Sequence, residues 1–193
     1  MNREKFMRKF FKNTKKSLLD DFDLYIQKDM EKAFDRAKDF LGVLDEEISA
    51  HVPIATNAPE ALNRDLKSKF VYHDNKIRFD VGRYYTLMFG EKLMHFYTSI
   101  INHETGEIYN DLGVSIPYNR VKTVQTSLLF KHKLKRNHHV FELRLAIDGM
   151  KDINLILRNI VVDNETPDAQ YGLDVKLKEI SEDLLYFLRE KIV

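Results

Sequence analysis

The side chains that could do chemistry are scattered along this sequence rather than grouped into a catalytic motif. Its 193 residues include seven histidines and thirty acidic residues, but no cysteine. The lack of cysteine excludes disulfides, thiolate nucleophiles and cysteine-ligated zinc or iron–sulfur clusters. No two histidines stand four residues apart around a glutamate, which is the helical spacing of zinc proteases. These observations predict neither a catalytic residue nor a metal ligand.

Glycine and serine patterns exclude two further classes of enzyme. The seven glycines stand singly, so no glycine-rich loop is present to hold a nucleotide phosphate. No G-x-S-x-G motif occurs, and Ser115, which follows Gly113 by two positions, lies in a strand-like run. We therefore expect a protein that is not an enzyme and that binds no cofactor.

One stretch of the chain is strongly basic. Between Asp111 and Glu142 there is no acidic residue, whereas six bases occur. These bases are Arg120, Lys122, Lys131, Lys133, Lys135 and Arg136. They could attract the phosphates of lipids or nucleic acid. Alternatively, they protect an edge strand and a hairpin tip from aggregation, which is the interpretation we favour. Because Phe130 and Phe141 are expected in the core, the loop 131–139 lacks an aromatic platform for stacking bases.

The first sixteen residues form a second basic segment. Phe6, Met7, Phe10 and Phe11 recur with the spacing of one helical face. The bases between them include Arg3, Lys5, Arg8, Lys9 and Lys12. Such a helix could lie on an anionic membrane. Alternatively, its phenylalanines pack on the protein while its bases pair with acids, and we favour this second interpretation.

A long amphipathic helix is predicted from Ser17 to Ser49. Its apolar residues step by three and four positions, and its other face is acidic. The stripe residues proposed to contact a partner or the rest of the chain are Phe22, Ile26, Met30 and Phe34. Pro53 and Pro59 end the helical pattern. We therefore divide the chain into a helical arm, residues 1–60, and a second domain, residues 61–193.

Beyond the arm, the apolar period changes to two, as expected for antiparallel strands. Successive strands are predicted around a turn at Asp74-Asn75, then up to Gly90, and then up to the turn at residues 103–106. A hairpin is predicted around Asp148-Gly149, because alternating apolar residues flank this positive-φ turn. Leu177, Ile180, Leu184, Leu188 and Ile192 predict a closing helix.

Several of these segments carry a resemblance to a known family. A strand Phe96-Tyr97-Thr98 precedes Ser115-Ile116-Pro117-Tyr118 and Val121. The segment Phe141-Glu142-Leu143-Arg144-Leu145 then leads to Gly149 and the terminal helix. This succession, from about Lys69 to Val193, resembles the bacterial pleckstrin-homology-like (PH-like) domains. The helical arm is additional to that pattern.

The resemblance implies a strongly bent antiparallel β-barrel of about seven strands, capped by the C-terminal helix, and so an α+β chain. It also implies a scaffold without chemistry of its own that is prone to form homo-oligomers. We therefore expect a protein-interaction module that binds a protein partner or itself, with membrane contact as the first alternative and nucleic-acid binding as the second. No apolar run approaches the roughly 20 residues that cross a bilayer, and we expect a cytoplasmic protein.

Overall fold

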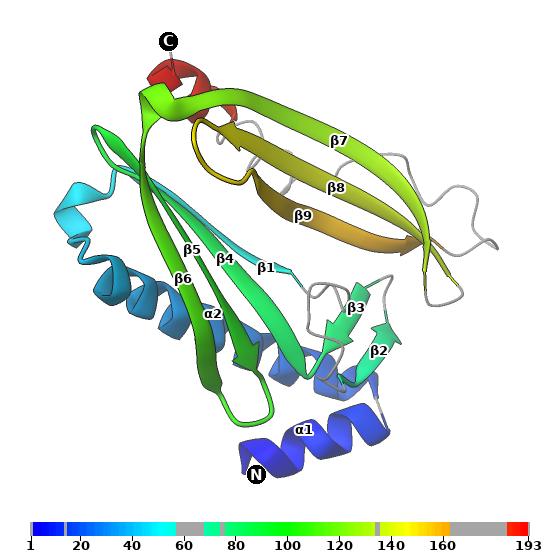
Figure 1. Ribbon diagram of the computed structural model, residues 1–193. Helices are drawn as coiled ribbons and strands as arrows, with labels where there is room; N and C mark the ends of the chain where they lie inside the picture. Colours follow the sequence, from blue (N-terminus) through cyan, green and yellow to red (C-terminus); the bar gives the residue numbers. More distant parts are fainter. Residues whose placement is uncertain are drawn as a thin grey trace.

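The computed structural model describes residues 2–13, 15–56, 68–73, 76–133, 136–162 and 185–192 (Figure 1). The helices are α1 (Arg3–Lys12) and α2 (Leu19–Leu41), the short 3-10 helices η1 (Lys16–Leu18), η2 (Asp45–Glu47) and η4 (Tyr118–Arg120), and a C-terminal helix at residues 185–192. The strands are β1 (Ala50–Thr56), β2 (Phe70–His73), β3 (Lys76–Phe79), β4 (Val81–Phe89), β5 (Leu93–Asn102), β6 (Glu107–Pro117), β7 (Val121–Lys133), β8 (Arg136–Ile147) and β9 (Ile153–Val162). This order confirms the predicted α+β class, with helices first, strands next and a helix last.

The strands form three antiparallel sheets. Four strands pair in the order β1-β4-β5-β6, three in the order β7-β8-β9, and β2 pairs with β3 in a separate hairpin. The chain passes from β6 to β7 through η4, where it turns out of one sheet and into the other (Figure 1). The predicted hairpins β4–β5, β5–β6 and β8–β9 are all present.

The sheets are not closed into the expected strongly bent β-barrel. The two larger sheets together hold seven strands, but no ladder of hydrogen bonds joins one sheet to the other within the described ranges. β6 ends at Pro117, which has no backbone N–H, and the following helical turn redirects the chain. The structure is therefore two sheets that meet at a corner, with an additional hairpin.

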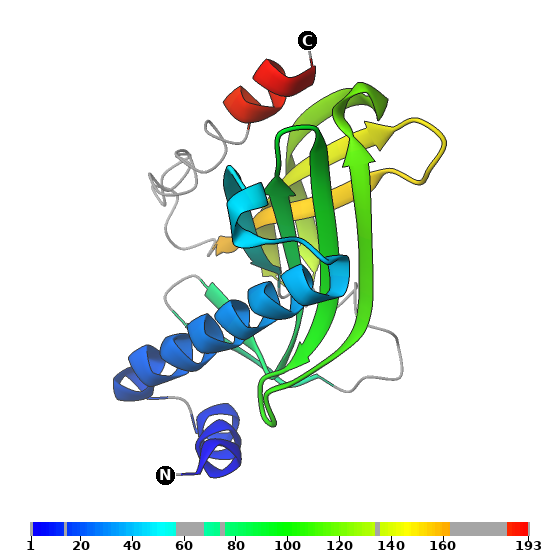
Figure 2. The same ribbon diagram turned by 90° about the vertical axis from the view of Figure 1, so that its left-hand side faces the viewer.

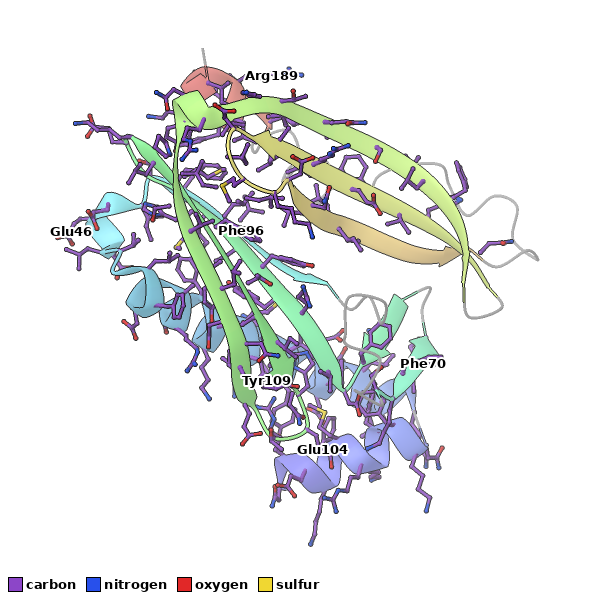
Figure 3. The ribbon with its side chains drawn as sticks, in the orientation of Figure 1. Glu46, Phe70, Phe96, Glu104, Tyr109 and Arg189 are labelled. Atoms are coloured by element: carbon purple, nitrogen blue, oxygen red, sulfur yellow. The ribbon has the colours of Figure 1, made fainter. Side chains whose placement is uncertain are left out.

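The main core lies between the two larger sheets. Phe96 of β5 points into this space (Figure 3), where it joins buried residues of both sheets such as Leu87, Leu143 and Leu155. Leu188 of the C-terminal helix belongs to the same core, and the ring of Phe187 lies 5.0 Å from that of Phe89. The C-terminal helix thus covers one end of the space between the sheets.

Helix α2 packs on the opposite, outer face of the four-stranded sheet (Figure 2). Ala33 and Ala37 of the helix are fully buried against Tyr84 and Tyr97 of the sheet. Gly113 of β6 permits the close approach, because a Cβ there would lie 2.8 Å from Leu41 Cδ2. The sheet is therefore covered on one face by the helix and on the other by the main core.

The long helix ends earlier than predicted. Helix α2 stops at Leu41 because Gly42 adopts a left-handed conformation with φ of 65°. The chain then enters β1, so residues 50–56, which the sequence assigned to the helical arm, are part of the sheet. Pro53 is tolerated in β1 because this strand lies at the edge of its sheet.

Two glycines occupy the positive-φ positions that the hairpins need. Gly149 has φ of 73° in the β8–β9 turn, and Gly106 has φ of 80° in the β5–β6 turn. The predicted Asp74-Asn75 turn and Leu177, Ile180 and Leu184 of the closing helix lie outside the described residues. Among the described helices, none has the length and apolar character needed to cross a membrane.

Candidate interaction surfaces

The α2 face that the sequence singled out is occupied by the chain itself. Phe22 is buried and stacks on Phe10 of α1, with ring centroids 4.3 Å apart. Ile26 packs in the same cluster, while Met30 and Phe34 pack against the outer face of the four-stranded sheet. The arm therefore docks on its own chain, and these four residues contact the rest of that chain.

Helix α1 also turns its apolar face inward. Phe6, Met7 and Phe10 are buried against α2, together with Leu19 and Phe22. Asn2 caps the helix, because its side-chain oxygen accepts a hydrogen bond from the Glu4 backbone N–H. The phenylalanines expected to contact either a membrane or the protein contact the protein.

A buried polar cluster anchors α1 to α2 and to the β5–β6 turn. Asp29 of α2 is 3% exposed and His103 is 1% exposed. His103 Nδ1 lies 2.7 Å from Asp29 Oδ2, and Arg3 of α1 donates both to Asp29 and to the His103 carbonyl. A Cβ at Gly106 would lie 2.9 Å from Arg3 Nη1, so the turn leaves room for this guanidinium. Burial opposes ionisation of Asp29, but its bonds to His103 and Arg3 outweigh that effect and lower its pKa.

The other bases of α1 divide into paired and outward-facing groups. Arg8 Nε donates to Glu104 Oε1 over 2.8 Å, and Glu104 lies at the β5–β6 turn beside α1 (Figure 3). Lys5, Lys9 and Lys12 are exposed and make no ion pair with any residue in the described part of the chain. Of the five candidate anion-binding residues in this segment, Arg3 and Arg8 are thus used internally, whereas the three lysines face outward.

The basic stretch of the second half falls on the long β7–β8 hairpin. Lys131 and Lys133 are backbone members of β7, and Arg136 begins β8, while Lys135 lies outside the described residues. Phe130 was expected in the core, but it is 67% exposed and contacts the ring of His139 edge-on at 4.5 Å. The expectation that this region lacks an exposed aromatic residue is therefore wrong.

Strand β7 carries an apolar pair on its inner face. Thr126 pairs with the fully buried Leu143, and paired residues of neighbouring strands share a face. Since side chains alternate, Leu128 and Phe130 lie on this same face, which is the face that contributes to the main core. They remain 54% and 67% exposed because the core does not extend this far along the strand.

A histidine and a serine meet on the outer face of the four-stranded sheet. His95 Nδ1 lies 2.8 Å from Ser115 Oγ, and the two residues are direct cross-strand partners on β5 and β6. Burial lowers the pKa of His95, so the ring is held neutral near pH 7. A neutral histidine beside a serine is the start of a nucleophile–base pair, but a cross-strand hydrogen bond explains the same geometry. We treat the pair as structural.

The surface that sequence reasoning missed is therefore the inner face of β7. Its signal was present as an uncharged run from Thr123 to Phe130, without proline or glycine, that continues a basic hairpin. Comparisons of the chain with protein-family models, with curated proteins and with solved structures found no match.

Proposed function

We propose that the chain is a non-enzymatic protein-interaction module built on a PH-like scaffold. Support for the scaffold comes from the arrangement of four strands followed by three, with a turn between the sheets and a helix over one end of the core. The hairpin β2–β3 and the helices α1 and α2 are additions to that plan. In this proposal the scaffold presents a strand to a partner protein and carries out no reaction.

The observation that carries the proposal is the contrast between occupied and open apolar surfaces. The apolar faces of α1 and α2 are consumed inside the chain. Leu128 and Phe130 stand together on one face of β7 and are more than half exposed. Two large apolar side chains that are exposed together on one strand support an interaction site there, because exposed apolar patches mark such sites. We therefore place the partner on β7.

A capture experiment with matched variants tests this proposal. The double variant Leu128→Asp, Phe130→Asp removes the apolar pair, and Leu24→Asp, Phe40→Asp changes two exposed residues of α2 as a control. We expect at least one protein from an extract of the source cells to bind the natural chain and the control, but not the β7 variant. Retention of the same proteins by both variants, or of none by the natural chain, contradicts the proposal.

In this proposal self-assembly would also use β7, because the apolar face of the arm is occupied by its own chain. Light scattering on the natural chain and on the β7 double variant distinguishes the two kinds of partner. A monomer in both cases supports a different protein as the partner. An oligomer that the β7 variant dissociates supports self-assembly instead.

A second candidate function is contact with an anionic membrane through the outward lysines of α1. Lys5, Lys9 and Lys12 lie on one helical face, and each base near such a surface contributes about 1 kcal/mol. Because Phe6 and Phe10 are buried, this contact would be electrostatic and without insertion. Sedimentation with phosphatidylserine vesicles should show binding that disappears at high salt and in the triple variant Lys5→Ser, Lys9→Ser, Lys12→Ser. Binding that resists salt contradicts it.

A further inference from the structure

We propose that β7 binds an extended, acidic peptide segment as an additional strand of the sheet β7-β8-β9. This inference rests on the proposed function and specifies the conformation and the charge of the partner. It is carried by three properties of β7, namely an edge with which no described strand pairs, two exposed apolar side chains on its inner face, and the bases that the sequence places at its ends.

The central part of β7, from Thr123 to Phe130, lacks the features by which edge strands avoid pairing with other chains, whereas lysines stand at both ends of the strand. In the order β7-β8-β9, no described strand pairs with its outer side. The register with β8 is regular from Thr123 to Lys133, so no bulge interrupts the strand there. The eight residues from Thr123 to Phe130 include no charge, proline or glycine. By contrast, edge strand β1 is short and contains Pro53, and edge strand β6 contains a bulge.

The inner face of β7 offers contacts to alternate side chains of an added strand. Residues of a strand that pairs with β7 would lie directly beside Leu128 and Phe130. The main-chain hydrogen bonds of the added strand would supply affinity, and contacts at every second residue would supply specificity. The expected partner segment therefore alternates apolar residues with polar ones.

The charge around β7 selects an acidic segment. No acidic residue occurs between Asp111 and Glu142, and the bases of this stretch lie before and after the uncharged run. The base Lys122 before the run is paired with Asp148 over 2.6 Å. After the run, the sequence places four bases within six residues, namely Lys131, Lys133, Lys135 and Arg136. A second copy of β7 would bring further bases to this strand, whereas an acidic peptide would neutralise them.

Synthetic peptides of about ten residues, the length of a typical long strand, provide the test. One peptide alternates glutamate and valine, a second alternates lysine and valine, and a third is the acidic peptide with proline at every fourth position. Binding of each fluorescein-labelled peptide to the full-length chain is measured by fluorescence anisotropy. The same measurement is made on the β7 double variant Leu128→Asp, Phe130→Asp and on the α2 control Leu24→Asp, Phe40→Asp.

We expect the acidic peptide to bind at least about tenfold more tightly than the basic and proline-containing peptides. Its affinity should fall several-fold between about 50 mM and about 500 mM salt, and about tenfold or more in the β7 variant, but not in the control. Equal binding of acidic and basic peptides, unchanged binding to the β7 variant, or no binding of the acidic peptide overturns the inference. If the peptide fails to bind as expected but capture of a protein still depends on Leu128 and Phe130, only the inference is contradicted and the proposed function remains. If capture also fails, both the inference and the proposed function are contradicted.

Discussion

The strands β6 and β7 follow one another in the chain, and each lies at the edge of its sheet. They differ in how much the rest of the described chain covers them. Helix α2 lies over β6, where Arg36 forms two hydrogen bonds of 2.7 Å to Asp111. Lys32 of the same helix donates to the Gly106 carbonyl at the start of that strand's hairpin. No described helix packs on β7 in this way, and its inner face is half open.

The two strands also differ in backbone regularity. In β6 the register shifts opposite Ser99, where Asn110 adopts φ of 56° and the strand is bulged. A bulge, a covering helix and acidic side chains are three separate ways to prevent edge-to-edge pairing. Between Thr123 and Phe130, strand β7 has no bulge and no charged residue, and no helix in the described part of the chain covers it. Strand β6 is thus held within the chain by α2, whereas contact of β7 with another chain is the proposal that the following experiments test.

The largest expected effect concerns the helix-covered side and the buried Asp29. The substitution Asp29→Ala removes the carboxylate that Arg3 and the buried His103 both contact. It should therefore lower the free energy of unfolding by about 3 kcal/mol. The control Asp35→Ala removes an exposed carboxylate of the same helix and should cost less than about 0.5 kcal/mol. Equal stabilities of the two variants, measured by urea unfolding, would show that the anchor of α1 is not structural.

A somewhat smaller loss of stability is expected when a side chain is added at Gly113, between α2 and β6. In Gly113→Val the new Cβ would overlap Leu41, so overpacking should lower the free energy of unfolding by about 2 kcal/mol. The matched change on β7, Thr123→Val, places a similar side chain on an exposed position and should change it by less than about 0.5 kcal/mol. Thermal unfolding of both variants compares their losses of stability. Similar losses for Gly113→Val and Thr123→Val would contradict the expected difference between β6 and β7.

The ion pair on β6 predicts a pH dependence. The hydrogen bond from Arg36 outweighs burial and lowers the pKa of Asp111 from 3.8 to about 2. Since the folded-state pKa is the lower one, this stabilisation is fully present above about pH 4 and is lost as the pH falls toward about 2. We expect the free energies of unfolding of the natural chain and of Asp111→Asn to differ by about 1 kcal/mol at pH 6, and to become similar near pH 2.

The matched change next to β7 is Asp148→Asn, which removes the exposed partner of Lys122 and keeps a residue suited to the turn. The difference in free energy of unfolding between this variant and the natural chain should be smaller than that for Asp111→Asn, because solvent screens the exposed pair Lys122–Asp148. Urea unfolding at a series of pH values tests both variants. A pH-independent difference for Asp111→Asn would contradict the assigned ion pair.

The smallest expected effect on stability is on β7 itself. Leu128→Lys should change the free energy of unfolding by less than about 0.5 kcal/mol, since Leu128 contributes little to the core. A charge in the middle of a free edge should nevertheless slow aggregation at high protein concentration. Light scattering over time compares this variant with Leu24→Lys on α2. A large loss of stability, or equal aggregation of the two variants, would show that β7 is not a free edge.

Local patterns predicted much of the fold. The alternation around Asp148-Gly149 identified the β8–β9 hairpin, because only a positive-φ turn joins two such strands so tightly. The three-and-four spacing identified α2, although Gly42 was not recognised as its end and residues 50–56 were not recognised as a strand. Pro53 misled that assignment, since proline excludes a helix interior but not an edge strand.

The surfaces were harder to predict than the elements. The cluster of Arg3, Asp29 and His103 joins residues that are far apart in the sequence, and no local pattern encodes their meeting. For Phe130, alternation indicates only the face of the strand, not how far the opposite sheet extends to cover it. Whether an apolar residue of β7 is buried therefore depends on contacts between the two sheets that the sequence of the strand does not encode.

Residue-resolved hydrogen exchange of the full chain, with and without the acidic peptide, tests most directly whether β7 receives the partner as an added strand. In the free chain, alternate amides between Thr123 and Phe130 should exchange rapidly, because an edge strand directs every second N–H away from its neighbour. Addition of the peptide should protect these amides and leave those of β6 unchanged. If the amides of β7 are already protected in the free chain, or if the peptide protects another element instead, β7 is not the strand that receives the partner.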